Sequence, residues 1–161
     1  MRKRTVDSID ALILNRLSKD ANITNKQLSE EIGLSAGATL VRVQNLWKNK
    51  IFKNYQASIA YDFFKFKYNV VALMTISPSF SAVFRSNISK QREVIYASKL
   101  SKENFVTSER YFLHIMCKSK EHLDECLSKI KKNVPVHSLE ISEIEDIIKD
   151  EALQINAEED L

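Results

Sequence analysis

The sequence predicts an α+β protein with a helical N-terminal domain and a sheet-containing C-terminal domain. Apolar residues recur at helical spacing through the first 50 residues, whereas short β-branched runs separated by amphipathic stretches follow from residue 69. The charge divides in the same way, because residues 1–60 hold 10 Lys/Arg against 5 Asp/Glu and residues 61–161 hold 14 against 16. We therefore expect a helical domain over 1–60, a linker over 61–68, a sheet domain over 69–150 and an acidic tail over 151–161.

The composition is typical of a globular protein that folds in a reducing compartment. Of the 161 residues, 44% are hydrophobic and 28% are charged, as in ordinary folded domains. No uncharged apolar run of about 18 residues occurs, and the opening MRKRTVDSID lacks the apolar core of a signal peptide. Two cysteines do not make a disulfide framework. We expect a cytoplasmic location, no membrane partner, and a basic N-terminal domain that suits a polyanion.

The N-terminal domain is predicted to contain three helices. Asp7 can cap the first helix, and Thr24 opens a capping box for the second. Gly33 should end the second helix, and Ser35 is a natural cap for a third helix over 36–48. Only three residues separate the second and third helices, which suits the steep crossing of a helix-turn-helix. The apolar residues expected to face inward from the third helix are Leu40, Val43, Leu46 and Trp47.

The rest of the chain is predicted to form a sheet with two helices. The segment IFKNYQASIAY, residues 51–61, alternates loosely as a strand does. Beyond it the order of elements is β-α-β-β-α-β, which is the split βαβ arrangement of a ferredoxin-like sandwich. The expected strands lie near 70–76, 94–100, 111–117 and 136–148, and the expected helices lie near 79–92 and 121–132.

Two of the expected strands, 70–76 and 111–117, are apolar on both faces. Both helices of a ferredoxin-like unit lie on one face of its sheet, so the second face needs another cover. The same sheet from a second copy is the simplest cover, because symmetric dimers are the commonest assemblies. We therefore expect at least a homodimer through the C-terminal domain.

The third helix has the residues expected of a helix that reads DNA. Small residues in its first turn allow close approach to a groove wall, and helix N-terminal amides favour phosphate. Gln and Asn can pair with adenine edges, whereas Arg and Lys suit backbone phosphates. The alternative is a solvated basic face on an ordinary three-helix core. The candidate DNA-binding residues are Ser35, Ala36, Gly37, Val41, Arg42, Gln44, Asn45, Lys48 and Lys53.

A series of short motifs marks the N-terminal domain. In chain order they are Val-Asp-x-x-Asp over 6–10, Ile13-Leu14, Asp20, the Leu28 to Leu34 segment ending in Gly-Leu-Ser, Arg42-Val43 before Leu46, and Phe52, Tyr55 and Ala57. In order and spacing they resemble the winged helix-turn-helix of the leucine-responsive regulatory protein (Lrp/AsnC) family. The resemblance continues through a βαββαβ domain and covers about residues 6–150. It implies a sequence-specific transcriptional regulator that binds double-stranded DNA. It further implies a C-terminal domain for dimerisation and effector sensing, and assembly of dimers into larger particles such as octamers.

Two departures from that family's pattern bear on function. Lys50 stands where the family has a glycine before its wing strand, so the lysine must adopt an unusual φ or the turn must change. The family's Gly-x-Tyr-Asp hairpin motif, near which small amino acids bind, falls on 100–104 or on 108–111, and neither register restores the glycine or the aspartate. An amino acid in an altered pocket, another ligand and an unused pocket all stay open. The candidate effector-binding residues are Ser101 and Asn104.

Other chemistry has weaker support in the sequence. His114, Cys117, His122 and Cys126 form an H-x2-C-x4-H-x3-C string of a kind that can suggest zinc. Residues three apart on a strand face opposite sides, and Cys126 lies in the apolar stripe of a helix, so we expect no metal. Without a Gly-rich phosphate loop or a nucleophile elbow, we expect neither an enzyme nor a cofactor. Two alternatives remain, namely a sensing or oligomerisation module without specific DNA binding, and a regulatory subunit of a metabolic enzyme.

Overall fold

The computed structural model describes residues 6–57, 59, 61–100, 107–149, 155, 156, 158 and 160. The described residues up to 57 and those from 149 onward form one compact unit, and those from 59 to 148 form a second. We call these the helical unit and the sheet unit. Among the helices described, none has the length and apolar character needed to cross a membrane.

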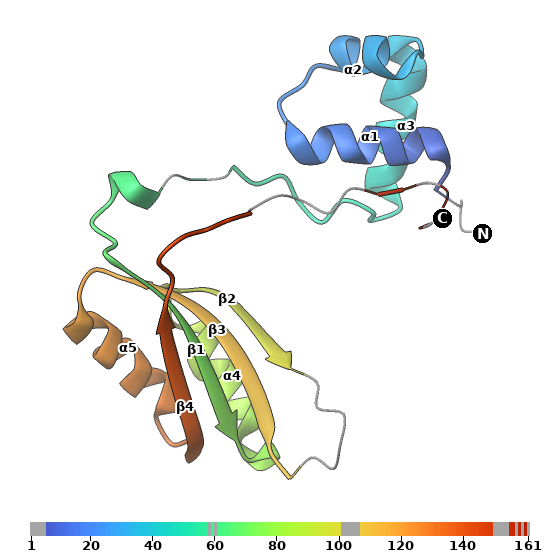
Figure 1. Cartoon of the computed structure of the whole chain (residues 1–161). Helices are drawn as coiled ribbons and strands as arrows, with labels where there is room; N and C mark the ends of the chain where they lie inside the picture. The colour runs from blue at the N-terminus through green and yellow to red at the C-terminus, as the bar shows by residue number, and fades with distance from the viewer. Residues whose placement is uncertain are drawn as a thin grey trace. The chain divides into compact units, whose positions relative to one another are not determined.

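The helical unit contains the three predicted helices, and the local signals that predicted them are present as contacts. The side chain of Asp7 accepts a hydrogen bond from the amide of Asp10, and that of Thr24 accepts one from the amide of Gln27, each within a complete capping box. The second helix ends as predicted at Gly33, which has a φ of 70°. The helices are α1 (Ser8–Lys19), α2 (Asn25–Ile32) and α3 (Ala36–Lys48) (Figure 1).

The side of α3 that faces inward differs from the prediction. Leu40 was expected inside but is 40% exposed, and Thr39 beside it is fully buried. The buried Thr39 hydroxyl donates to a backbone carbonyl one turn earlier at 3.1 Å, so its burial leaves no unpaired group. Trp47 is only partly covered, by the rings of Phe52 and Tyr55 at centroid distances of 5.1 and 5.0 Å. The buried core of the helical unit consists of Ile13, Leu17, Leu28 and Leu46.

The chain leaves α3 through a left-handed residue. Lys50 has a φ of 57°, which is the first of the two alternatives expected there. Its amide donates to the carbonyl of Trp47 at 2.9 Å, and the amide of Ile51 donates to that of Leu46 at 3.0 Å, the two bonds of a Schellman motif. The strand predicted over 51–61 is wrong for the residues described, because 51–57 and 59 have no regular structure and 61–63 form a short 3-10 helix. A lone alternating segment finds no neighbouring strand here to complete a ladder.

The sheet unit has the predicted β-α-β-β-α-β order. Its sheet has the strand order β2-β3-β1-β4, and every neighbouring pair is antiparallel. This arrangement is the predicted ferredoxin-like fold (Figure 1). The helix expected over 79–92 begins with a 3-10 turn at Pro78 and ends at Ser89, and the strand expected over 136–148 ends at Glu143. The elements are β1 (Tyr68–Ile76), α4 (Ser81–Ser89), β2 (Val94–Leu100), β3 (Glu109–Cys117), α5 (Lys120–Lys131) and β4 (Val136–Glu143).

Both helices of the sheet unit cover the same face of the sheet (Figure 1). The alternation predicted by strand geometry is regular, because every second residue of β1 and of β3 is buried under the helices. Cys117 from β3 and Cys126 from α5 both lie in this core, as predicted for Cys126. The core residues of the two central strands are Val70, Ala72, Met74, Ile76, Tyr111, Leu113, Ile115 and Cys117.

The opposite face of the sheet is open and partly apolar. Val71 and Leu73 of β1 and Phe112 of β3 are half-buried there. Tyr96 of β2 is 58% exposed, and its ring packs against Phe112 with 6.0 Å between centroids. The expected homodimer would cover this face, and it stays a prediction.

Part of the predicted acidic tail is attached to α1. The side chain of Asn15 donates to the carbonyl of Ile155 at 2.8 Å and accepts from its amide at 2.7 Å. This reciprocal pair resembles one rung of a β-ladder, with an amide side chain in place of a strand. It explains why the described residues after 149 belong to the helical unit.

Candidate nucleic-acid interface

The N-terminus of α3 presents unpaired backbone donors at an exposed surface. Ser35 caps the helix, and its hydroxyl oxygen accepts from the amide of Ala38 at 3.2 Å. The amides of Ala36 and Gly37 have no acceptor within the described part of the chain. The side chains of the first turn are too small to shield these amides, and all three positions from 35 to 37 are exposed. Such a helix end is suited to a phosphate group.

Gly37 is not required by the packing of the helix itself. A Cβ built at this position meets no atom within 4 Å, and its φ is not in the left-handed region. Glycine inside a helix costs about 0.5–1 kcal/mol relative to alanine. The absence of an internal reason is consistent with a close approach by something outside the chain.

A stripe of exposed residues continues along α3 from this end. Val41, Gln44 and Lys48 follow Gly37 at spacings of four, three and four, so they lie on one side of the helix. Val41 is 55% exposed. Leu40 lies beside this stripe, and sequence reasoning missed it because an apolar residue at helical spacing was assigned to the core. Small, apolar, amide and cationic groups thus occur in sequence along one exposed side.

Arg42 lies apart from the stripe, in a contact between α3 and α1. One terminal nitrogen of its guanidinium donates to both carboxylate oxygens of Asp7, at 2.9 and 2.8 Å, and to Asp10 at 2.8 Å. Asp10 is 5% exposed and the side chain of Arg42 is 19% exposed, so the pair is largely removed from water. The bond from Arg42 holds the pKa of Asp7 below its usual value, and the two carboxylates raise the pKa of Arg42. This contact fixes the angle between the two helices.

Asn45 is also turned toward α1. It is half-buried and lines a small hollow together with Val6 and Arg42. Lys48 and Lys53 are exposed, and Lys50 lies between them in the turn described above. The structure therefore brings most of the predicted set to one exposed surface, and it places Arg42 and Asn45 beside it. We call the exposed set from Ser35 to Lys48, without Arg42 and Asn45, the α3 face.

The other predicted sites do not converge in the described residues. Ser101 and Asn104 lie outside the part of the chain that the structure describes. His114 contacts Asn69 at 2.5 Å, whereas His122 contacts Glu93 at 3.1 Å on the other side of the sheet from it. Burial lowers the pKa of the half-buried His114 and raises that of the fully buried Cys117 thiol. Within the described ranges, no group of three or more His, Cys, Asp or Glu residues could hold a metal ion.

Comparison with known proteins gives a consistent result. Residues 6–53 match a family model described as winged helix-turn-helix, DNA-binding. The transcriptional regulator AzlB of Bacillus subtilis is 36% identical over 73 residues, which are 45% of this chain and 46% of AzlB. The regulator LrpA of the same organism is 29% identical over 135 residues, which are 80% of this chain and 91% of LrpA. Across AzlB and two further relatives the chain spans only 34% to 48% of the relative's length.

Solved structures extend the likeness to the whole fold. The transcriptional regulator NMB0573 of Neisseria meningitidis, in complex with L-Met, has a TM-score of 0.82 at 20% identity, covering 94% of this chain and 97% of its own. The feast or famine regulatory protein Rv3291c of M. tuberculosis, in complex with L-methionine, has a TM-score of 0.80 at 21% identity, covering 94% and 100%.

The fold and the α3 face define a class of protein, in which a winged helix-turn-helix unit precedes a ferredoxin-like unit. Within that class, the matched motifs, the curated relatives and the whole-chain fold agree. The chain is similar to members of the Lrp/AsnC family in its N-terminal sequence and in its whole fold, in agreement with the resemblance carried by the sequence motifs.

Proposed function

We propose that the protein is a sequence-specific DNA-binding transcriptional regulator. The observation that carries this proposal is the α3 face, where two unpaired amides, a glycine without an internal packing role and an exposed Gln44 and Lys48 share one side of a helix. On DNA, the amides of Ala36 and Gly37 would bind a phosphate while Gln44 reaches a base edge in the major groove. Ser35, Lys48 and Lys53 would contact phosphates, and Val41 would contact a thymine methyl group.

Arg42 and Asn45 have different parts in this proposal. Arg42 has its guanidinium bound by two carboxylates, so its main effect on DNA binding is to hold α3 at a fixed angle to α1. Asn45 reaches a base only if its half-buried side chain changes rotamer. Gln44 is therefore the residue that the exposed surface favours for reading sequence.

A second copy of the chain is the partner we propose for the open face of the sheet. Leaving Leu73, Phe112 and Tyr96 in water would be unfavourable, and an isologous pair of sheets would cover all three residues at once. Such a dimer would supply two α3 helices, which can bind half-sites about one helical turn of DNA apart. Further association of dimers, up to an octamer, and control by a small effector such as an amino acid are the remaining parts of the proposal.

A gel-shift titration across salt concentrations tests the central claim. The full chain and DNA from its own upstream region are compared with random DNA of equal length. We expect specific binding, with a logarithmic salt slope of roughly −0.9 per phosphate contacted. Equal affinity for the two DNAs contradicts the proposal and favours a sensing or oligomerisation module instead.

Two single substitutions on the α3 face separate base reading from phosphate contact. Gln44→Ala should lower the preference for the specific site by about 1–3 kcal/mol and leave binding to random DNA nearly unchanged. Lys48→Ala should weaken binding to both DNAs by a similar factor and reduce the salt slope by about one. Glu30→Ala, at an exposed residue of α2, is a control in which binding should not fall. Identical behaviour of the two α3 variants would show that the reading face is wrongly assigned.

A further inference from the structure

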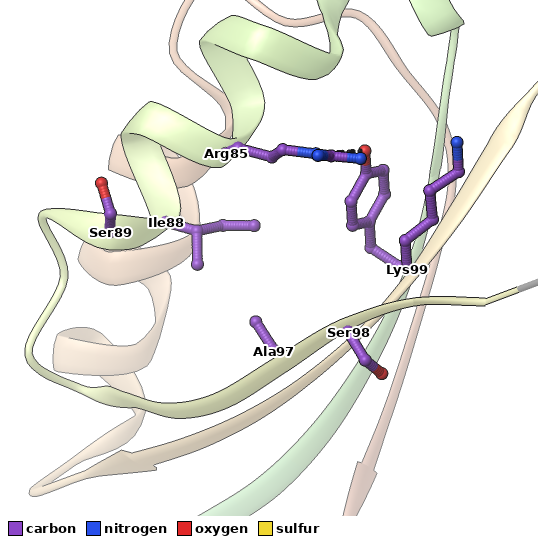
Figure 2. Close-up of a pocket in the computed structure, with 7 residues that line it drawn as sticks. Arg85, Ile88, Ser89, Ala97, Ser98 and Lys99 are labelled. Atoms are coloured by element: carbon purple, nitrogen blue, oxygen red, sulfur yellow. Dashed lines mark hydrogen bonds between the residues drawn. The ribbon is translucent and has the colours of Figure 1, made fainter. Parts of the chain in front are cut away.

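A hollow of about 360 Å³ lies on the helix-covered side of the sheet unit, between α4 and the edge strand β2 (Figure 2). Ala97 and Lys99 of β2 pair with Leu113 and Tyr111 of β3 and share their face of the sheet. Leu113 and Tyr111 are buried under α4, whereas Ala97 and Lys99 are exposed. The helix therefore covers β3 and leaves the edge strand open. The volume is within the range of about 300–1,000 Å³ that small-molecule sites occupy.

No carboxylate is among the described residues that line this hollow, and the nearby Glu109, which accepts bonds from two of them, is already engaged. Glu109 accepts hydrogen bonds from Lys99 at 2.5 Å, from the hydroxyl of Tyr111 at 2.7 Å and from the hydroxyl of Ser81. The bond from Lys99, followed by those from Ser81 and Tyr111, lowers the pKa of Glu109 to about 2. A carboxylate with three donors has little capacity left for a further cation, such as the ammonium group of a ligand.

Arg85, by contrast, brings unused hydrogen-bond donors to the hollow. Its Nε donates to the Tyr111 hydroxyl at 3.2 Å, and its guanidinium carbon lies 5.9 Å from the centre of that ring. Both terminal nitrogens have no partner among the described residues. Figure 2 shows the side chain of Arg85 extended from α4, with its guanidinium end directed to the side on which Lys99 lies. Two cations, Arg85 and Lys99, thus border the hollow. Of the two, Lys99 is the one that is paired with Glu109.

The rest of the hollow is apolar. Ile88 of α4 and Ala97 of β2 lie on opposite sides of it (Figure 2), and Tyr111 is also among the residues that line it. Ala97 is small and exposed, which leaves room for a ligand against the edge strand. A site with unpaired cationic donors at one end and an apolar wall at the other binds an anion that carries a hydrocarbon group.

We infer that this hollow binds a small organic acid, with its carboxylate on the Arg85 guanidinium beside Lys99 and an uncharged alkyl chain or ring against Ile88 and Ala97. An α-ammonium group adds nothing to binding here, because no carboxylate is among the described residues that line the hollow and the nearby Glu109 is engaged. The inference names a ligand class for the effector in the proposed function. Binding of the acid does not depend on that function, but any effect of binding on DNA recognition rests on it. The site lies within one protomer and is formed by α4, β2 and β3.

Direct binding to the full chain without DNA tests this inference, so that failure of DNA binding cannot be confused with it. Isothermal titration calorimetry would compare the affinities for hexanoate and 4-methyl-2-oxopentanoate with those for leucine and hexylamine. We expect both acids to bind, leucine to bind no more tightly than its 2-oxo acid, and hexylamine not to bind. Tighter binding of leucine, binding of hexylamine, or no binding of either acid would overturn the inference.

Three variants locate the site. Arg85→Met keeps the length of the side chain and removes the free donors, and it should weaken hexanoate binding by about tenfold or more. Ala97→Leu fills the hollow from an exposed position without changing any charge, and it should abolish binding. Arg92→Met is the matched control, because the side chain of Arg92 is 80% exposed and lies outside the hollow. Unchanged binding by Arg85→Met, or an equal loss in Arg92→Met, would contradict the assignment.

Discussion

The helical and sheet units both contain a paired ionic network, but they leave different donors unpaired among the described residues, namely the first backbone amides of α3 in the helical unit and the terminal nitrogens of Arg85 in the sheet unit. In the sheet unit, Glu109 accepts hydrogen bonds from three donors and has little capacity left for another. In the helical unit, Arg42 and its two carboxylates are equally well paired inside, yet the first amides of α3 are left without acceptors at the surface. The comparison teaches where a ligand can gain hydrogen bonds, because only unpaired groups offer them without breaking existing contacts.

The largest expected effect in the helical unit is the loss of the Arg42 contact. Arg42→Met leaves the carboxylate of Asp10, which is 5% exposed, without its cation. Removing one partner of a buried pair costs about 3–5 kcal/mol, and the partial exposure of Asp7 places the expected loss near 3 kcal/mol. Urea unfolding followed by the fluorescence of Trp47, the single tryptophan of the chain, reports this unit.

Arg16→Met is the matched control in the same unit. Arg16 also pairs with two acidic residues, Glu31 at 2.6 Å and Asp20 at 3.7 Å, but its side chain is 30% exposed and both partners are about half exposed. The expected loss is below about 1 kcal/mol. Similar losses in the two variants would mean that the contact between α1 and α3 has no special role.

The next largest effect concerns acid stability of the sheet unit. Because its donors lower the folded-state pKa of Glu109 to about 2, the charged carboxylate stabilises the fold. That stabilisation is complete above the ordinary pKa of about 4.5 and is lost as the pH falls toward 2. Glu109→Gln should flatten the dependence of the melting temperature on pH in this window, with a difference on the order of 2 kcal/mol between its two ends. Glu140→Gln, whose side chain is 63% exposed, should retain the wild-type slope.

The two glycines should respond to alanine in opposite directions. Gly33 has a φ of 70°, so Gly33→Ala should destabilise the helical unit by about 1 kcal/mol. Gly37 has open space around its Cβ position, so Gly37→Ala should stabilise the unit by about 0.5 kcal/mol and weaken DNA binding through loss of close approach. Unfolding by urea and the gel shift together measure both properties. If Gly37→Ala binds DNA as tightly as wild type, the glycine has no part in the interface.

The helical unit shows how much of the molecule could be predicted from sequence. Capping signals are local, so the starts of α1 and α2 and the left-handed Gly33 that ends α2 were predicted correctly. The family motif also flagged Lys50. The inward face of α3 was partly wrong, because hydropathy cannot show that Thr39 pairs its hydroxyl within its own helix and can be buried in place of Leu40.

Contacts between distant residues were harder to predict. Arg42 and Asp7 are 35 positions apart, and no periodicity links them, so Arg42 was assigned to phosphate. The hollow beside Arg85 depends on α4 covering β3 and leaving the edge strand β2 open, which element order alone does not specify. In contrast, the alternating burial of β1 and β3 follows from the strand period of two once α4 and α5 cover one face of the sheet.

An effect of similar small size tests the two helix ends against each other. Gly33 after α2 and Lys50 after α3 both take the left-handed conformation where the helix ends, with φ of 70° and 57°. Lysine pays a steric penalty there that glycine does not, so Lys50→Gly should stabilise the helical unit by about 0.5–1 kcal/mol. The same change removes an exposed cation next to α3 and should weaken binding to all DNA sequences alike. Lys50→Ala separates the two effects, since it loses the charge without relieving the strain. A stabilised Lys50→Gly with unchanged DNA affinity would mean that the lysine has no role at the interface and that the helix end tolerates it at a small cost.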